Sequence, residues 1–424
     1  MRLAMFIPIY FYTILLLILT TITQANRTIL QTTFFQPPSN KTPIILDTFT
    51  HPSQNNLGSW HGALEDLPFK KGRDAIHLHP SDPDHTYHTQ LSSTQCFDLT
   101  PYQAWFLHII FTGLPTFSVS LHQNNAQCNP GSNPYPETWD SIDASHYTTP
   151  SPSNKTQKKD IYIPLSHFHI DQRRVLAISL GSFYPPYNHT LTIHKIEFVP
   201  KLPSGIQPPR KIPNGTLRLR CTRPGSFAFG IDDGIPSLAN EVKEILDSEG
   251  VHVTFFVVGK GLRDSRTGLR RFYRQMLEKG HQVALHSDRH LKMEGMRTTQ
   301  AIDDDIRSNR KTFRSLLARY FRPPYGTIGS RTRERLAAQI RDPQVINWSV
   351  DIEDWMWADS DTPERQLEAF YRDVERGGNL AVLHYLNSTT VGYFREIIRF
   401  VRKKGLRIMR IDQCLEDPAA PLLV

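Results

Sequence analysis

The sequence predicts an all-β sandwich followed by an α/β domain with a parallel sheet, either open or closed into a barrel. In the first half, apolar and polar residues alternate with period two between turn residues. In the second half, short apolar strands alternate with amphipathic helices. A length of 424 residues also exceeds one typical core, so we expect two domains.

Composition narrows the kinds of partner. Hydrophobic residues make up 39% and charged residues 21%, as in an ordinary folded protein. The formal net charge of +8 would attract anionic wall polymers, but a scattered solvated surface is the favoured explanation. The sequence has no basic run with interleaved aromatic residues, so we expect no nucleic-acid partner.

The N-terminal residues have the pattern of a secretory signal. Arg2 precedes an apolar stretch that includes Ile14–Leu19, and Thr23–Ala25 supplies small residues for cleavage. An uncleaved anchor is the alternative, because the apolar stretch approaches spanning length. Pro8 and the small residues favour cleavage. We therefore expect a signal peptide at 1–25, a mature chain without a membrane span, and a secreted, extracellular protein that can associate with the cell wall.

Glycosylation and disulfides are also expected of an exported chain. Asn-X-Ser/Thr triplets, which accept N-glycans, begin at Asn26, Asn40, Asn154, Asn188, Asn214 and Asn387. A further triplet at Asn347 falls in an expected buried strand, where a glycan would not fit. The cysteines are even in number, with Cys96 and Cys128 in the first half and Cys221 and Cys414 in the second. Pairing within each half is the economical arrangement if the halves are separate domains.

The expected sandwich spans residues 26–199 and contains short strands separated by turns. The clearest runs are 76–78, 105–111, 117–122, 160–165, 175–180 and 191–198. Residues 129–159 are polar and rich in proline, serine and asparagine, so we expect a surface loop there.

The α/β domain is expected at 217–418, with a tail at 419–424. A proline-rich segment, 200–216, precedes it and is expected to be a stiff linker. The expected strands are 226–231, 253–258, 282–285, 345–350, 380–383 and 406–411, with helices between most of them.

Ionisable residues directly follow several of these strands. Asp232 and Asp233 follow the first, His286 follows the third, and Asp351 and His384 follow two later strands. In barrel enzymes the active site is assembled from the carboxyl ends of several strands. This recurrence therefore predicts an active site at that end of the sheet.

A metal site is expected at the same place. His286 and His290 are four residues apart, a spacing that would put both imidazoles on one side of a helical turn. Asp233 can complete a three-ligand site with open positions for water and substrate, which is typical of a catalytic metal. Asp232 is then free for a separate role.

Five motifs in order carry a family resemblance: Ile231–Gly234, His286–His290, Phe321–Gly326, Asp351–Trp355 and Val382–His384. They resemble the motifs of NodB-type polysaccharide deacetylases, carbohydrate esterase family 4, which includes chitin deacetylases. The resemblance covers about Cys221 to Pro418 and implies a distorted (β/α) barrel. The cysteines at 221 and 414 also resemble the bridge of fungal members.

The sandwich is more loosely similar to the N-terminal domains of some fungal deacetylases, through Asn56–Gly58 and Cys96–Leu99. This similarity implies a jelly-roll-like domain. The domain could be a carbohydrate-binding module or only a folding partner of the second half.

The resemblance implies a metal-dependent hydrolysis of N-acetyl groups from a chitin-like polymer. It implies that Asp233, His286 and His290 hold a divalent cation, zinc in the first place, with cobalt as the alternative. It further implies that Asp232 is the general base, oriented by Arg322, and that His384 is the general acid, held by Asp354. The implied substrate contacts are the backbone N–H of Tyr325, Pro324, and a methyl pocket at Leu383 and Trp355.

Simpler structural roles compete with some of these. Arg322 could be an ordinary salt-bridge residue, although the adjoining Pro-Pro-Tyr-Gly favours the site. Trp355 could be core, and Asp351 is more readily a local hydrogen-bond acceptor than a catalytic group. The first motif also departs from the family pattern at Gly230, Ile231 and Ile235, and Tyr385 stands where aspartate is common.

Three functions remain open at this point. N-acetyl hydrolysis is favoured, and an O-acetyl esterase acting on xylan or another wall glycan would use the same chemistry. A carbohydrate-binding wall protein with an inactive deacetylase domain is the third, because the first motif is altered.

Overall fold

The computed structural model describes residues 42–423, except 93–94, 150–156 and 314–318. The chain divides into two units, Met1–Thr42 and Pro43–Val424, and the second unit holds the fold described below. Among the described residues, no helix is both long and apolar enough to cross a membrane.

Some sequence predictions fall outside the described residues. These are the signal peptide at 1–25 and the glycan acceptors Asn26, Asn40 and Asn154.

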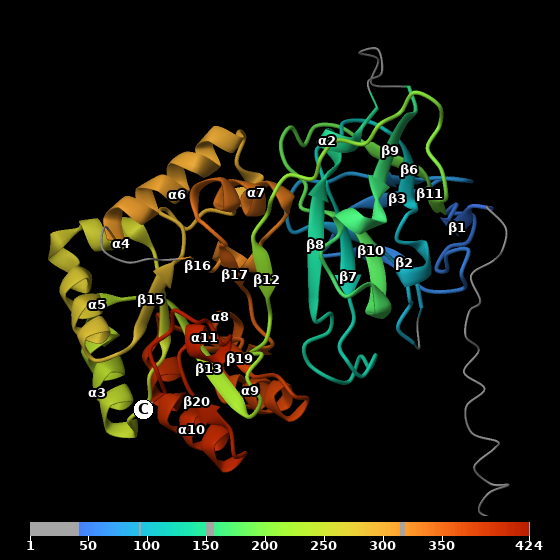
Figure 1. The fold of residues 1–424 in the computed structure, drawn as a ribbon. Helices are drawn as coiled ribbons and strands as arrows, with labels where there is room; N and C mark the ends of the chain where they lie inside the picture. The colour runs from blue at the N-terminus through green and yellow to red at the C-terminus, as the bar shows by residue number, and fades with distance from the viewer. Residues whose placement is uncertain (1–41, 93–94, 150–156, 314–318, 424) are drawn as a thin grey trace, which may run out of the picture. The chain divides into compact units, whose positions relative to one another are not determined.

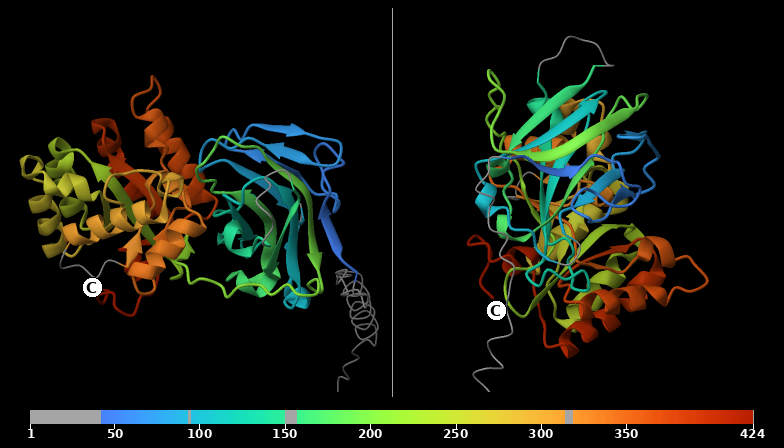
Figure 2. Two further views of the ribbon diagram at one scale, coloured as in Figure 1. Left: turned by 90° about the horizontal axis from the view of Figure 1, so that it is seen from above. Right: turned by 90° about the vertical axis from the view of Figure 1, so that its right-hand side faces the viewer.

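The first half forms two antiparallel sheets that face each other (Figures 1 and 2). One sheet contains β1 (Ile44–Asp47), β3 (Phe69–Lys71), β4 (Ile76–Leu78), β6 (Phe106–Thr112), β9 (Lys159–Pro164) and β11 (Leu191–Val199). The other contains β2 (His61–Leu64), β5 (Thr86–Gln90), β7 (Ser118–Gln123), β8 (Thr138–Asp143) and β10 (Val175–Gly181). Except for the β7–β8 hairpin, every connection from β4 to β11 crosses between the sheets, which agrees with a jelly-roll-like sandwich.

The expected surface loop at 129–159 is wrong in its middle part. Thr138–Asp143 pairs with β7 along its whole length as β8, and α2 (Ala144–Tyr147) follows it. The last four residues of β8 are buried although most are polar. Polar side chains from elsewhere in the chain satisfy them, so the usual hydrophobic alternation is missing from this strand.

The second half builds a nine-stranded parallel sheet with helices on its outer side (Figure 1). Its strands are β12 (Thr216–Arg218), β13 (Ser226–Gly234), β14 (Thr254–Val257), β15 (Gln282–Leu285), β16 (Tyr320–Phe321), β17 (Gln344–Ile346), β18 (Val350–Asp351), β19 (Leu380–Tyr385) and β20 (Arg407–Ile408). The order is β12-β17-β16-β15-β14-β13-β19-β18, with β20 beside β13.

Helices fill most of the connections. They are α3 (Ala239–Glu249), α4 (Gly259–Arg263), α5 (Leu269–Glu278), α6 (Thr299–Phe313), α7 (Ser330–Gln339), α8 (Asp354–Trp357), α9 (Arg365–Glu375), α10 (Ser388–Lys403) and α11 (Ile411–Cys414). Apolar residues such as Phe229, Phe255 and Phe394 pack between sheet and helices. A second cluster, which includes Ala228 and Phe256, fills the other face of the sheet.

The sheet must curl, because its edges are joined by a short segment. The single strand expected at 345–350 is instead two strands, β17 and β18, which lie near opposite edges. Ile346 and Val350 are four residues apart, so they are separated by at most about 14 Å. Among the described strands β12 and β18 do not pair, and the sheet is therefore an incompletely closed barrel.

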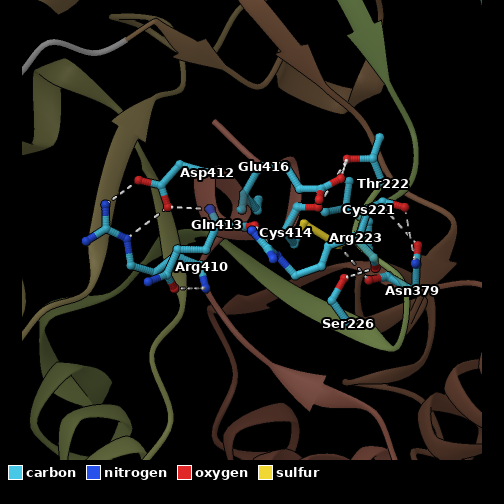
Figure 3. The surroundings of a disulfide bond; sticks show 12 residues. Cys221, Thr222, Arg223, Ser226, Asn379, Arg410, Asp412, Gln413, Cys414 and Glu416 are labelled. Atoms are coloured by element: carbon cyan, nitrogen blue, oxygen red, sulfur yellow. Dashed lines mark hydrogen bonds and ion pairs between the residues drawn. A yellow bond between two sulfur atoms is a disulfide. The ribbon is translucent and has the colours of Figure 1, made fainter. Parts of the chain in front are cut away.

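Each half of the chain contains one disulfide, and neither bridge joins the two halves, as expected. Cys96 pairs with Cys128 in the sandwich, and Cys221 pairs with Cys414 across 193 residues. The second bridge joins the segment before β13 to α11 (Figure 3). Backbone N–H groups of Thr222 and Arg223 both donate to the carbonyl of Cys414, which reinforces the same junction.

In two expected glycan acceptors, the side-chain amide nitrogen already donates a hydrogen bond within the protein. The Nδ2 of Asn214 donates to Asp140 at 2.7 Å, and that of Asn387 donates to Asp359. Asn347 is buried, as expected, and donates to the carbonyl of Gly326. Because a glycan is attached through this nitrogen, the exposed Asn188 is the better acceptor among the described sites.

The buried carboxylate of Asp140 in β8 joins the sandwich, the linker and the barrel. It pairs with Arg333 of α7 at 3.1 Å and with Lys211 of the linker. Arg333 also donates to the carbonyls of Trp139 and Gly215. Burial alone would raise the pKa of Asp140, but Arg333 and Lys211 outweigh it and lower the pKa to about 2. The end of the linker is thus fastened to both domains.

Replacing Asp140 is expected to give a pH-dependent loss of stability. Because its pKa is lowered on folding, the ionised carboxylate stabilises the fold above about pH 4, and this contribution of about 2 kcal/mol disappears as the pH falls towards 2. Urea unfolding of the wild type and Asp140→Asn should therefore differ at pH 7 and converge at low pH. A constant difference across this range would contradict the assignment, and Asp66→Asn, at an exposed carboxylate, is the control.

Candidate functional site

The carboxyl ends of the barrel strands bring the expected ionisable residues together. Asp232 and Asp233 lie at the end of β13, and Asp232 is in register with His384 of β19. His286 directly follows β15, and Arg322 directly follows β16. These strands are parallel, so their ends meet at one edge of the sheet.

A bulge lets two adjacent carboxylates serve the same site. Side chains alternate along a strand, so Asp232 and Asp233 would ordinarily point in opposite directions. The register of β13 against β19 shifts between Asp232 and Gly234, and Asp233 has a left-handed backbone with φ of 43°. Bulges commonly re-aim side chains beside active sites.

Among the described residues, Asp233, His286 and His290 form a group that could hold a metal ion. One ligand atom from each lies within 4.8 Å of the others. The Oδ2 atom of Asp233 is 3.1 Å from Nε2 of His290 and 4.0 Å from Nε2 of His286. A carboxylate with two imidazoles is a donor set that suits zinc and similar divalent ions, and it leaves coordination positions open.

His286 is prepared to be a ligand through Nε2. Its Nδ1–H donates to the carbonyl of Arg322 at 2.7 Å, which leaves Nε2 with its lone pair. Burial lowers the pKa of His286 to about 4, so the imidazole is neutral at pH 7. The tautomer and the charge state both fit a bound cation.

The expected helical turn between the two histidines is wrong. Ser287 and His290 have left-handed backbones, with φ of 58° and 56°, and residues 286–290 form no helix. The N–H of His290 donates to Oγ of Ser287 at 2.8 Å, which closes the loop. The imidazoles converge, with ring centroids 5.0 Å apart, because of this strained loop.

Arg322 fixes Asp232 inside the barrel. Its guanidinium is fully buried and donates to Oδ1 of Asp232 at 2.7 Å and to the carbonyl of Gly230 at 3.2 Å. Burial raises the pKa of Asp232, and the positive charge of Arg322 opposes this rise. Arg322 is therefore a salt-bridge residue and a part of the site at once.

Asp354 holds His384 by two bonds. One carboxylate oxygen accepts from the His384 backbone N–H at 2.7 Å, and the other pairs with Nδ1 at 2.8 Å. Burial lowers the pKa of His384, but Asp354 and the two aspartates of β13 outweigh it and raise the pKa to about 9. The imidazole is thus protonated at neutral pH in this environment, with Nδ1 occupied and Nε2 available.

Two departures from the family pattern have packing reasons. A Cβ atom at position 230 would lie 2.5 Å from the guanidinium nitrogens of Arg322, so Gly230 makes room for that side chain. The ring of Tyr385 occupies the space beside Gly234 that any side chain there would need, and its hydroxyl bonds to Tyr273. The structure gives no packing reason for Ile235, which is exposed.

A cleft of about 630 Å³ opens over these residues. Trp355 and Tyr325 line it with exposed side chains, which excludes a core role for Trp355. Asp351 also lines it, and its Oδ1 accepts from the Glu353 N–H at 2.7 Å, as a local acceptor would. Burial raises the pKa of Asp351 to about 6.

Two expected substrate contacts do not line the cleft. Leu383 is buried on the face of β19 that packs against the helices, and the alternating residue Val382 lines the cleft instead. Pro324 is buried, and its neighbour Pro323 lines the cleft. Further lining residues that the motifs did not reveal include Asp84, Lys292, Trp348, Leu386 and Thr390.

Metal binding is expected to depend on His290. Zinc or cobalt should raise the thermal unfolding temperature of the wild type, because a ligand that binds only the folded state stabilises it, by about 2.7 kcal/mol at a hundredfold excess over Kd. His290→Ala should lose most of this rise and the visible absorption of bound cobalt. His51→Ala, at an exposed histidine outside the cleft, is the matched control. An unchanged cobalt spectrum in His290→Ala would contradict the site.

In comparison with known proteins, residues 220–339 match the model of the family described as Polysaccharide deacetylase. The chain is 28% identical to a chitin deacetylase of Arthroderma benhamiae, over 50% of this chain and 57% of that protein. It is 28% identical to a chitin deacetylase of Pestalotiopsis sp, over 49% and 70%. It thus spans little more than half the length of the first of these relatives.

Two solved structures are also similar. The chitin deacetylase of Colletotrichum lindemuthianum is 24% identical with a TM-score of 0.44, over 49% of this chain and 95% of that one. A family 4 pseudoenzyme of Bacillus anthracis is 20% identical with a TM-score of 0.41, over 47% and 69%.

Proposed function

We propose that this chain contains a polysaccharide deacetylase domain and that it hydrolyses N-acetyl groups of a chitin-like N-acetylglucosamine polymer, and the family match at 220–339 supports this proposal. One observation carries the proposal. The cation-binding group of Asp233, His286 and His290 lies in the same cleft as an anchored carboxylate, Asp232, and an anchored imidazole, His384. Metal-assisted hydrolysis of an amide uses such a base and such an acid beside a Lewis acid.

Asp233, His286 and His290 would hold the divalent cation, zinc first and cobalt as the alternative. A cation bound there polarises the amide carbonyl and makes water more acidic. Asp232, fixed by Arg322, accepts the proton of the attacking water. The Asp232 carboxylate can do so only while it is ionised, which the pairing with Arg322 favours.

His384 gives a proton to the leaving amine through Nε2, because Nδ1 is engaged by Asp354. The high pKa of the imidazole keeps this proton available at neutral pH. The backbone N–H of Tyr325 would donate a hydrogen bond to the oxyanion that forms when water attacks the carbonyl. The backbone at Tyr325 is left-handed, with φ of 61°. The methyl group of the acetyl unit would pack against Trp355 and Val382, both of which line the cleft.

We also propose that the protein is extracellular. The two disulfides support this, because such bonds persist in oxidising compartments.

Substituting Asp232→Asn should lower the rate of acetate release by at least about a hundredfold, because the general base is lost. The cobalt spectrum should be retained, since the three cation-binding side chains are unchanged. Mass spectrometry of N-acetylglucosamine oligomers incubated with protein and zinc measures the loss of acetyl groups. An unaltered rate in Asp232→Asn would refute the assigned base.

The same assay on acetylated xylan separates the alternatives. Release from xylan alone would replace the proposed substrate by an O-acetyl ester. A wild type that binds zinc yet releases acetate from neither polymer would favour the inactive binding protein.

The pH dependence is expected to report the pairing of Asp354 with His384. Because the protonated imidazole is the acid, kcat/KM should fall as the pH rises past about 9. Asp354→Asn removes a charge that raises this pKa, so the alkaline limb should move to lower pH by about one to three units. Asp361→Asn makes the same charge change at an exposed site and should leave the limb in place. Identical profiles for all three proteins would contradict the assigned acid.

A further inference from the structure

The cleft is not lined by the deacetylase domain alone. Asp84, in the connection between β4 and β5 of the sandwich, also lines it. On the basis of the proposed function, we propose that Asp84, Lys292 and Tyr325 form a binding subsite for a sugar unit next to the one that reacts.

Asp84 is held against the deacetylase domain by two partners. Its Oδ2 pairs with Nζ of Lys292 at 2.6 Å, and its Oδ1 accepts from the hydroxyl of Thr327. Thr327 directly follows the turn that carries Tyr325. The position of this sandwich carboxylate is therefore coupled to the turn beside the metal-binding group.

Contacts nearby keep this part of the sandwich in place. Oγ of Ser118 in β7 lies 2.7 Å from Oγ of Ser330 at the start of α7. Ser182, after β10, donates to the carbonyl of Ile328 at 3.3 Å. The wall that Asp84 contributes is thus a fixed part of the cleft within the unit Pro43–Val424.

The three side chains offer what a sugar ring needs. The ring of Tyr325 is 61% exposed and can cover an apolar face of the sugar. The ammonium of Lys292 lies 5.7 Å from the centre of that ring and can donate to hydroxyls, and the carboxylate of Asp84 can accept from them. A small number of polar groups placed beside an aromatic face is typical of a small-molecule site.

The subsite adjoins the reaction centre. The ring centroids of Tyr325 and His290 are 4.7 Å apart, and His290 belongs to the metal-binding group. A sugar on Tyr325 therefore neighbours the unit whose acetyl group reacts. It follows that affinity should increase with oligomer length until a unit reaches Asp84.

Calorimetric binding of N-acetylglucosamine monomer and pentamer to the full-length protein tests this inference without relying on turnover. Asp84→Asn keeps the size of the side chain and should weaken binding of the pentamer by about tenfold, because a hydrogen bond to a charged group is lost. Binding of the monomer, which can occupy the reaction centre without reaching the subsite, should change by less than about twofold. Asp84→Glu should restore part of the pentamer affinity, and thermal unfolding checks that each variant is folded.

Asp82→Asn is the matched control. Asp82 also pairs with Lys292, at 2.9 Å, but does not line the cleft. Asp82→Asn should leave the ratio of monomer to pentamer affinity unchanged. If it reproduces the effect of Asp84→Asn, the carboxylates act only through Lys292 and direct contact with the sugar is refuted.

Equal weakening of monomer and pentamer binding by Asp84→Asn, or no weakening of either, would also overturn the subsite. A wild type that binds the pentamer more tightly than the monomer but releases no acetate would retain the subsite and refute the proposed hydrolysis.

Discussion

The buried guanidinium of Arg322 is the interaction on which the barrel and its site both depend. It bonds to carbonyls of β13, β17 and β19 as well as to Asp232, and it lies 4.3 Å from the ring centre of Phe256. A buried charge without its partner is strongly destabilising, so Arg322 and Asp232 require each other. The same bonds that hold strand ends in the curled sheet therefore set the orientation of the proposed base. Gly230 is part of this arrangement, because it leaves the space that the guanidinium occupies.

The sequence predicted most residues of the candidate site because ionisable residues follow apolar strands. Asp232, His286 and His384 stood out in this way, and parallel strands bring such positions to one edge. Spacing alone misjudged how His290 is placed, since four-residue spacing is also reached by a loop with left-handed residues. The β-bulge at Asp233 could not be predicted either, because bulges have no reliable pattern in a single sequence.

Other parts could not be predicted because they depend on distant residues. The strand β8 carries two buried acidic residues with distant partners: Asp140 pairs with Arg333 and Lys211, and Asp143 accepts from the hydroxyl of Tyr184. Asp84 contributes to the cleft only because the fold brings it beside Lys292, more than two hundred positions later in the chain. Leu383 and Val382 are adjacent apolar residues, and which of them faces the helices is decided by the register of β19 against β13.

The junction around Asp140 has a consequence for how such a protein can diversify. Its carboxylate, Lys211 and Arg333 come from the sandwich, the linker and α7, and loss of Asp140 would leave the buried guanidinium of Arg333 without this charged partner. A replacement sandwich without an acid at this position would have the same effect. The two domains therefore depend on each other, and a chimaera joined between them should be stable only if Asp140, Lys211 and Arg333 are kept together.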